Sequence, residues 1–210
     1  MTFVWEPIAA QPGVRRESAT SVTLIAAAPD GEMYFRGSVP EDASAATATR
    51  HIEFEVPPGR LQLRMGVNGA GGPIDNDDRE VVVPDLTGTD LAFGTPRLYV
   101  ARTARDFQLI RKDATAVPTA SREFRRTERL VVRPAVYAAG NATVTVTSKL
   151  LNKQGHRLAD VAVTAAESGA PYLVDVPLAA LAPGEYLLEL TAATEGQKPI
   201  TDLIAFRVEG

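Results

Sequence analysis

A turn that leads into an alternating strand near the C-terminus constrains the fold of this chain most. Pro183 and Gly184 form the turn, because proline fixes φ for the first turn position and glycine tolerates the positive φ that follows. In the next residues, 185–190, Tyr186, Leu188 and Leu190 fall on one face, and Glu185 and Glu189 fall on the other. Successive side chains of a strand point to opposite faces of its sheet. One face must therefore be buried against a second sheet.

A shorter copy of this pattern occurs earlier in the chain. At 57–65 a Pro-Pro-Gly turn leads into a segment in which Leu61 and Leu63 alternate with arginine and glutamine. Two copies indicate two similar β units. Tyr186, just after its turn, also resembles the tyrosine corner of immunoglobulin-like folds, in which the hydroxyl bonds to upstream backbone. The earlier copy has Leu61 at the equivalent position.

The length of 210 residues accommodates two sandwich domains of about 100 residues each. Pro84 ends a strand-like run and a polar, turn-forming segment follows it. We therefore predict a first β-sandwich domain at 1–84 and a second at 85–210. No segment keeps a helical period over three turns. The predicted fold class is all-β, with two tandem antiparallel sandwiches of the immunoglobulin or fibronectin type III kind.

Composition argues against several classes of function. The net charge is −4, and neither predicted domain has the basic excess typical of nucleic-acid binding. The chain has no cysteine, hence no disulfide and no thiolate nucleophile. No apolar run approaches the roughly 20 residues that span a membrane. The two histidines, His51 and His156, fall in different predicted domains at surface positions, and no catalytic or cofactor motif is present. We predict no enzyme and no cofactor.

An acidic cluster is the best candidate for a metal site. Asp75, Asp77 and Asp78 fall in a Gly-rich segment, 68–78, that we predict to be a loop, and their oxygens could coordinate calcium. The residues that follow, arginine and glutamate, do not continue an EF-hand pattern. A solvated acidic loop is the favoured interpretation, and we predict no metal site.

A basic stretch is the best candidate for an interaction site, with members Arg122, Arg125, Arg126 and Arg129. These arginines could contact an acidic partner. The favoured alternative is that they form the solvated face of one strand and protect its edge from pairing with other chains.

Three functions compete on this basis. The leading hypothesis is a non-enzymatic structural or interaction module, whose strand edges and end loops contact protein. The second is a carbohydrate-binding module, which needs an exposed aromatic platform such as Tyr34 or Tyr99 would provide. The third is an enzyme with an unrecognised site. The single tryptophan, Trp5, is predicted to anchor the first core.

Five segments together resemble the C-terminal accessory region of large bacterial proteins related to the von Willebrand factor A domain, of the type found in Acidobacteria. They are 2–7, the 52–59 strand and turn, the 83–86 junction, 122–130 and 181–186. The metal-adhesion motif of the A domain, Asp-x-Ser-x-Ser, is absent, so no ligand of that domain is carried over. The resemblance implies a longer parent protein, secreted or in the cell envelope. It also implies that this region contacts a protein partner or the preceding domains of its own chain.

Overall fold

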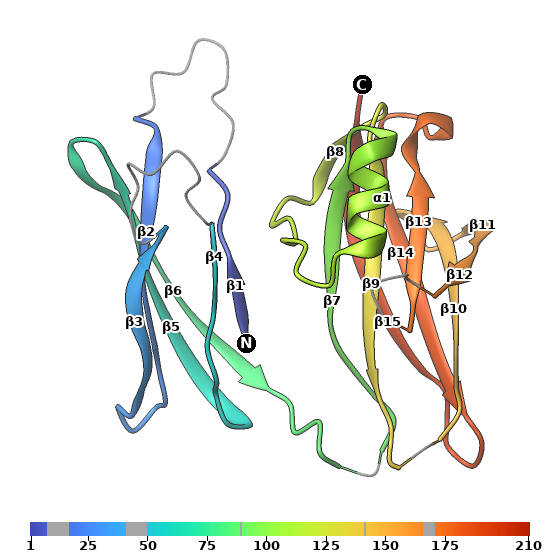
Figure 1. Ribbon diagram of the computed structural model, residues 1–210, viewed down its shortest axis with the longest axis horizontal. Helices are drawn as coiled ribbons and strands as arrows, with labels where there is room; N and C mark the ends of the chain where they lie inside the picture. Colours follow the sequence, from blue (N-terminus) through green and yellow to red (C-terminus); the bar gives the residue numbers. More distant parts are fainter. Residues whose placement is uncertain (8–16, 41–49, 89, 141, 166–170) are drawn as a thin grey trace. The chain divides into compact units, whose positions relative to one another are not determined.

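The computed structural model describes residues 1–7, 17–40, 50–88, 90–140, 142–165 and 171–210. They form two compact units, Met1–Asp85 and Leu86–Gly210. Strands dominate both units (Figure 1), and almost all of them pair antiparallel, which confirms the predicted fold class. The division between the units lies next to the boundary predicted at Pro84.

The first unit is built on a sheet with strand order β3-β2-β5-β6, and β1 pairs with β4 in a smaller second sheet. A turn with a φ of +95° at Gly31 joins β2 to β3. The strands are β1 (Thr2–Val4), β2 (Ala19–Ala27), β3 (Met33–Val39), β4 (His51–Glu53), β5 (Gly59–Gly69) and β6 (Gly72–Val83).

The core of the first unit lies between these two sheets. Leu24, Leu61 and Leu63 are buried on the larger sheet, and Ile52 and Phe54 pack against them, as the alternation predicts. Among the described residues Trp5 does not belong to this cluster, so they do not support its predicted role as the core anchor. The strand β1 ends before Trp5, which is half-buried with the Arg50 guanidinium 5.9 Å from its ring centroid.

The predicted loop at 68–78 is also wrong, because β6 begins at Gly72 and pairs with β5 along its whole length. Aspartate has a low β propensity, yet opposite charges across a strand pair offset it. Asp78 lies opposite Arg64, and Nη1 of Arg60 lies 3.5 Å from Oε1 of Glu80. These pairs lie on the solvent face of an edge strand, where a polar sequence costs no burial of charge.

The second unit is a sandwich of two sheets, with strand orders β11-β10-β14-β15-β8 and β12-β13-β9-β7. All pairs are antiparallel except that of β8 with β15, which is parallel. The strands are β7 (Ala92–Ala101), β8 (Glu123–Arg125), β9 (Arg129–Tyr137), β10 (Val144–Asn152), β11 (Arg157–Val161), β12 (Val163–Thr164), β13 (Leu173–Pro177), β14 (Gly184–Thr194) and β15 (Ile200–Glu209). A 3-10 turn, η1 (Leu178–Ala180), precedes β14.

The predicted apolar face of β14 is buried in this sandwich. Leu188 and Leu190 have no exposed surface and belong to one cluster with Leu130 and Val132 of the facing sheet. At the start of the strand, the Tyr186 hydroxyl donates a 2.8 Å hydrogen bond to the carbonyl oxygen of Ala182, which confirms the predicted tyrosine corner.

One side of the sandwich is closed by a strand that changes sheets. Residues 157–161 pair with β10 as β11, and residues 163–164 pair with β13 as β12. Both elements are edge strands of their sheets, so this continuous segment joins the two layers. On the opposite side, where β7 and β15 lie, the segment 119–125 bonds to both layers: the Thr119 N–H donates to the Leu98 carbonyl of β7, and β8 pairs with β15.

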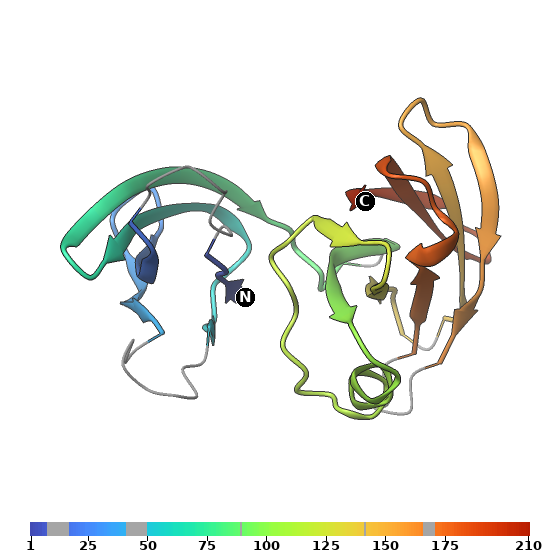
Figure 2. The same cartoon turned by 90° about the horizontal axis from the view of Figure 1, so that it is seen from above.

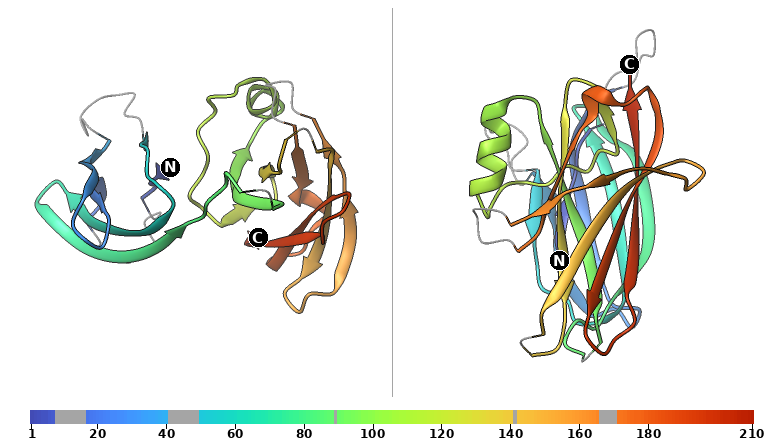
Figure 3. Two further views of the ribbon diagram at one scale, coloured as in Figure 1. Left: turned by 90° about the horizontal axis from the view of Figure 1, so that it is seen from below. Right: turned by 90° about the vertical axis from the view of Figure 1, so that its right-hand side faces the viewer.

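A short helix, α1 (Ala104–Lys112), covers the outer face of the smaller sheet (Figures 2 and 3). Thr103 and Asp106 form a capping box at its N-terminus. Its buried residue Ile110 packs on Tyr99 and Val131. The apolar periodicity of nine residues is too short to predict a helix, but the Thr-x-x-Asp spacing was a usable signal.

Candidate functional site

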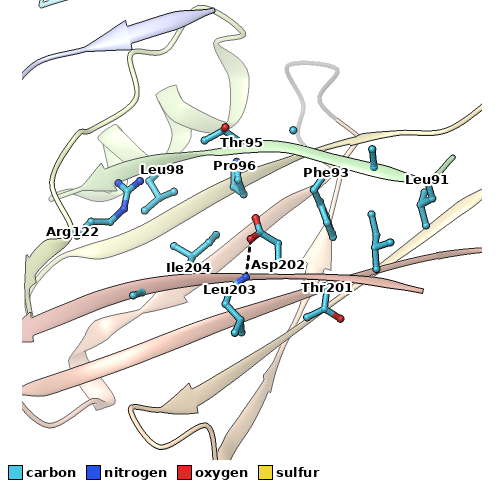
Figure 4. A pocket seen from close by; sticks show the side chains of 14 residues that line it. Leu91, Phe93, Thr95, Pro96, Leu98, Arg122, Thr201, Asp202, Leu203 and Ile204 are labelled. Atoms are coloured by element: carbon cyan, nitrogen blue, oxygen red, sulfur yellow. Dashed lines mark hydrogen bonds between the residues drawn. The ribbon is translucent and has the colours of Figure 1, made fainter. Parts of the chain in front are cut away.

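An elongated groove of about 750 Å³ runs along the open side of the second unit, between β7 and β15 (Figure 4). Polar and apolar atoms contribute almost equally to its walls, which come from β7, from β15 and from Arg122. The side chains that line it include those of Leu91, Phe93, Pro96, Leu98, Arg122, Asp202 and Ile204.

The β15 wall presents a free and regular strand edge. On its other edge β15 pairs with β14 without a register shift from Gly184↔Val208 to Ala192↔Ile200. The Arg207 N–H points away from β14, because it donates a 2.8 Å bond to the Arg122 carbonyl of β8's N-terminal end. Backbone groups alternate in direction along a strand. The N–H of Leu203, four residues earlier, therefore points into the groove.

The β7 wall is a poorer template for pairing. Its register with β9 shifts between Gly94 and Arg97, and Pro96 within this segment has no N–H to donate. Beyond the shift, the Leu98 carbonyl already accepts a 2.7 Å bond from Thr119 N–H. Irregularity and proline are devices that prevent an edge from pairing. An added strand would therefore pair with β15 rather than with β7.

Both ends of the groove are closed. At one end the Leu91 N–H donates a 2.6 Å bond to Oε1 of Gln197, in the turn between β14 and β15. At the other end β8 joins β15, and Arg122 lies there (Figure 4). Between them the groove exposes β15 from Thr201 to Ala205, a length of about 16 Å at ~3.3 Å per residue.

Two charged side chains of opposite sign line this groove. The Asp202 carboxylate accepts a 2.9 Å bond from the Leu203 N–H and so covers the free edge at its centre (Figure 4). The Arg122 guanidinium donates to the carbonyl of Ser121 at 3.2 Å, and partial burial lowers the pKa of this guanidinium. Within the described part of the chain, neither charge has an ion-pair partner. Such a groove is suited to bind an extended chain with complementary charges.

The acidic candidates do not converge. Asp75 and Asp77 share one face of β6, and Asp78 points to the other, because side chains alternate along a strand. Nε of Arg79 donates to Asp77 at 2.7 Å. Across the described residues, no group of three acidic or histidine side chains is placed to hold a metal ion.

The basic candidates do not form the face of one strand, so that interpretation is wrong. A turn at Glu128, whose N–H donates to the Arg125 carbonyl, separates β8 from β9, and the two strands enter different sheets. Arg129 pairs with Asp175 through two hydrogen bonds, which raise the pKa of its guanidinium, and lies 4.9 Å from the Phe107 ring centroid. Arg126 donates to the Ala179 carbonyl at 3.0 Å. Of the four, Arg122 alone lines the groove.

The histidine and tyrosine candidates lie apart from the groove. His156 is exposed in the turn after β10, and His51 is half-buried on β4 of the first unit. Tyr99 is 1% exposed beneath α1, and Tyr34 is half-buried with its hydroxyl 3.1 Å from Glu32. Neither tyrosine provides the exposed platform that the carbohydrate hypothesis requires. The groove itself was not predicted, because two strands 100 residues apart in sequence form it.

Comparison with protein-family models and with curated proteins gave no match. Among solved structures, the chain is similar to a tetra-tandem repeat in the extending region of a large adhesion protein, at 14% identity and a TM-score of 0.29, over 92% of this chain and 44% of that one. It is also similar to a Parabacteroides merdae β-glucuronidase, at 9% identity and a TM-score of 0.27, over 89% of this chain and 21% of that one. It is similar as well to the major pilin subunit of Bacillus cereus, at 10% identity and a TM-score of 0.23, over 93% of this chain and 66% of that one.

The chain spans less than half of the length of the first two of these structures. Similarity at this level defines neither a family nor a function. In the described residues there is no helix long and apolar enough to cross a membrane.

Proposed function

We propose that this chain is a non-enzymatic interaction module, and that its second unit binds an extended segment of another protein by strand addition to β15. The observation that carries the proposal is the edge from Thr201 to Ala205. It borders the groove, and among the described residues its Leu203 N–H is bonded only to the Asp202 side chain. Main-chain hydrogen bonds supply affinity in this mode of recognition, and pockets for alternate side chains supply specificity.

An enzyme is less well supported by the same site. General acid–base and nucleophilic catalysis require converging titratable groups. The residues that line the groove include one carboxylate, of Asp202, and one guanidinium, of Arg122, without a histidine, serine or lysine.

The proposal includes a longer parent protein that is exported or associated with the cell envelope. The resemblance to accessory regions of von Willebrand factor A-related proteins supports an exported or envelope-associated protein, in which this region holds a partner or spaces other domains. An open groove on a rigid sandwich fits either use, because the packed core holds the edge in place when it is occupied.

The test compares two substitutions of one residue. Leu203→Pro removes the N–H that an added strand needs, whereas Leu203→Ala keeps this N–H and removes the same exposed side chain. Proline is tolerated at an edge whose N–H does not serve the ladder. Wild type and both variants are immobilised and exposed to envelope and secreted proteins of the organism that encodes the chain, and captured proteins are identified and quantified by mass spectrometry.

We expect one protein to be retained stoichiometrically by wild type and Leu203→Ala, and at least tenfold less by Leu203→Pro. Equal retention by all three would exclude strand addition at this edge. Retention of glycan in place of protein would favour the carbohydrate-binding alternative. Circular dichroism of Leu203→Pro verifies that the sandwich is intact before its result is used.

A further inference from the structure

We infer that the groove recognises a free C-terminal segment of its partner, bound parallel to β15 with the terminal carboxylate at Arg122 and a basic side chain at Asp202. This inference rests on the proposed strand addition to β15, and adds to it the direction and the sequence of the bound segment.

The direction follows from how β8 ends the groove. Glu123 of β8 pairs in parallel with Arg207 of β15. Arg122, one residue before Glu123, therefore lies beside Phe206, one residue before Arg207. A strand in the groove cannot continue in the sheet beyond this point. A chain that ends here presents a carboxylate to Arg122 if it runs parallel to β15, and an ammonium group if it runs antiparallel. The guanidinium attracts the first and repels the second.

The register follows from the alternation of β15. Ile204 and Asp202 point inward, whereas Leu203 and Ala205 are exposed. With its last residue beside Ile204, the bound chain would direct that side chain inward against the buried Leu98. Its carboxylate would then extend toward Arg122. The last residue of the partner is therefore apolar.

The second inward position lies beside Asp202. A carbonyl of the bound strand would accept the hydrogen bond from the Leu203 N–H. The Asp202 carboxylate, which accepts this bond at 2.9 Å in the unbound protein, would then be released. This carboxylate has no cationic partner among the described residues, so a lysine or arginine two positions before the terminus would pair with it. The third inward position lies beside the half-buried Ile200 and favours another apolar residue. The recognised sequence is apolar, any, basic, any, apolar, with a free carboxylate.

Four labelled peptides test the two charges independently. The reference is TVTKTV with a fluorophore on its N-terminus and a free carboxylate. The others carry a C-terminal amide, a glutamate in place of the lysine, or both changes. Binding to the whole chain is measured by fluorescence anisotropy at low salt. We expect the reference to bind most tightly, and each single change to raise Kd roughly two- to fivefold, the range of a partly exposed ion pair.

Three variants assign the charges to residues. Arg122→Met should abolish the preference for the free carboxylate and keep the preference for lysine. Asp202→Asn should abolish the preference for lysine and keep the preference for the free carboxylate. The asparagine side chain still offers an acceptor for the Leu203 N–H. Arg125→Met is the matched control, because Arg125 is an exposed arginine on β8 that does not line the groove. It should keep both preferences.

Equal binding of the four peptides to wild type would overturn the inference. If Leu203→Pro still abolished that equal binding, strand addition to β15 would remain supported. Only the proposed direction of the bound segment and the recognition of its charges would be rejected. Absence of peptide binding up to millimolar concentration would overturn the inference as well. The capture experiment with Leu203→Pro would then decide the proposed function separately.

Discussion

The hydroxyl of Tyr186 and the carbonyl oxygen of Ala182 lie 2.8 Å apart and join the first residues of β14 to the turn that precedes them. The ring of Tyr186 also stacks on Phe206 of β15, with centroids 5.8 Å apart. One side chain therefore fixes both the entry of the chain into β14 and the contact of β14 with its neighbour.

Tyr186→Phe should lower the free energy of unfolding of the second unit by about 0.5–1 kcal/mol, the net value of a hydrogen bond that remains near solvent. The ring stack is retained in this variant. Trp5, the only tryptophan, lies in the first unit. Unfolding followed by both tryptophan fluorescence and far-UV circular dichroism therefore distinguishes the two units. Tyr137→Phe is the control, because its side chain is 42% exposed, and an equal loss in both variants would contradict the prediction.

The alternation of apolar and polar residues was sufficient to predict most strands. In 185–190 and 61–65, period-two patterns mark faces that the structure buries, because an apolar face of a strand has to pack on another layer. The tyrosine corner was predictable for a similar reason, since a proline and a glycine fix the turn before the tyrosine. Such local rules need no knowledge of distant residues.

Arg133→Met should lower the free energy of unfolding of the second unit by about 2–3 kcal/mol, since hydrogen bonds from charged donors are worth more than neutral ones. The Arg133 guanidinium is buried beneath α1, donates to the carbonyls of Ile110 and Asp113, and lies 4.8 Å from the Tyr99 ring centroid. Hydrogen exchange of the α1 amides should accelerate more than exchange in β14. Arg105→Met, at an exposed position on the same helix, is the control.

A pH dependence is predicted for the cap of α1. Hydrogen bonds with the Thr103 side chain, and then with the N–H groups of Thr103 and Arg102, hold the pKa of Asp106 below its usual value of 3.8. A carboxyl whose pKa is lower in the folded state stabilises that state above the unfolded pKa, and the effect is lost as pH falls through the folded pKa. The stability difference between wild type and Asp106→Asn should therefore be constant near neutral pH and disappear as the pH falls through the lowered pKa of Asp106.

The measurement is thermal unfolding of both proteins across pH 2 to 7, with Glu195→Gln as the matched control. Glu195 is exposed in the turn after β14, so its replacement should leave no pH-dependent difference. A difference for Asp106→Asn that persists unchanged at pH 2 would show that the cap acts through shape and not through charge.

Calcium should not stabilise the first unit. Asp75 and Asp77 face away from Asp78 across β6, whereas calcium needs six to eight oxygen ligands that converge. We expect millimolar calcium to leave the midpoint of thermal unfolding, followed by Trp5 fluorescence, unchanged. A saturable increase that Asp77→Asn abolishes would contradict this prediction, because a ligand bound only by the folded state must raise its stability.

The features that sequence reasoning missed depend on tertiary partners. The acidic segment of β6 forms a strand because it pairs with β5, where Arg64 lies opposite Asp78 and Arg60 lies near Glu80, a relationship absent from the local pattern. The groove depends on β7 and β15 belonging to different sheets on the same side of the sandwich. The basic stretch looked like one surface because its arginines are close in sequence, but a turn sends Arg125 and Arg129 to different layers.

The segment at 157–164, which leaves one sheet and enters the other, makes the second unit asymmetric in its resistance to separation of its layers. To part the sheets along that side, backbone hydrogen bonds of β11 or β12 must break. On the side of β7 and β15 the two layers are tied near one end by the bonds of Thr119 to Leu98 and of β8 to β15, and at the other end by the bond between Leu91 and Gln197. Between these ends Leu98 and Ile204 pack in the shared core. One side of the sandwich is therefore joined by continuous backbone at β11 and β12, whereas the other is joined at the two ends of the groove and leaves the edge of β15 between them exposed.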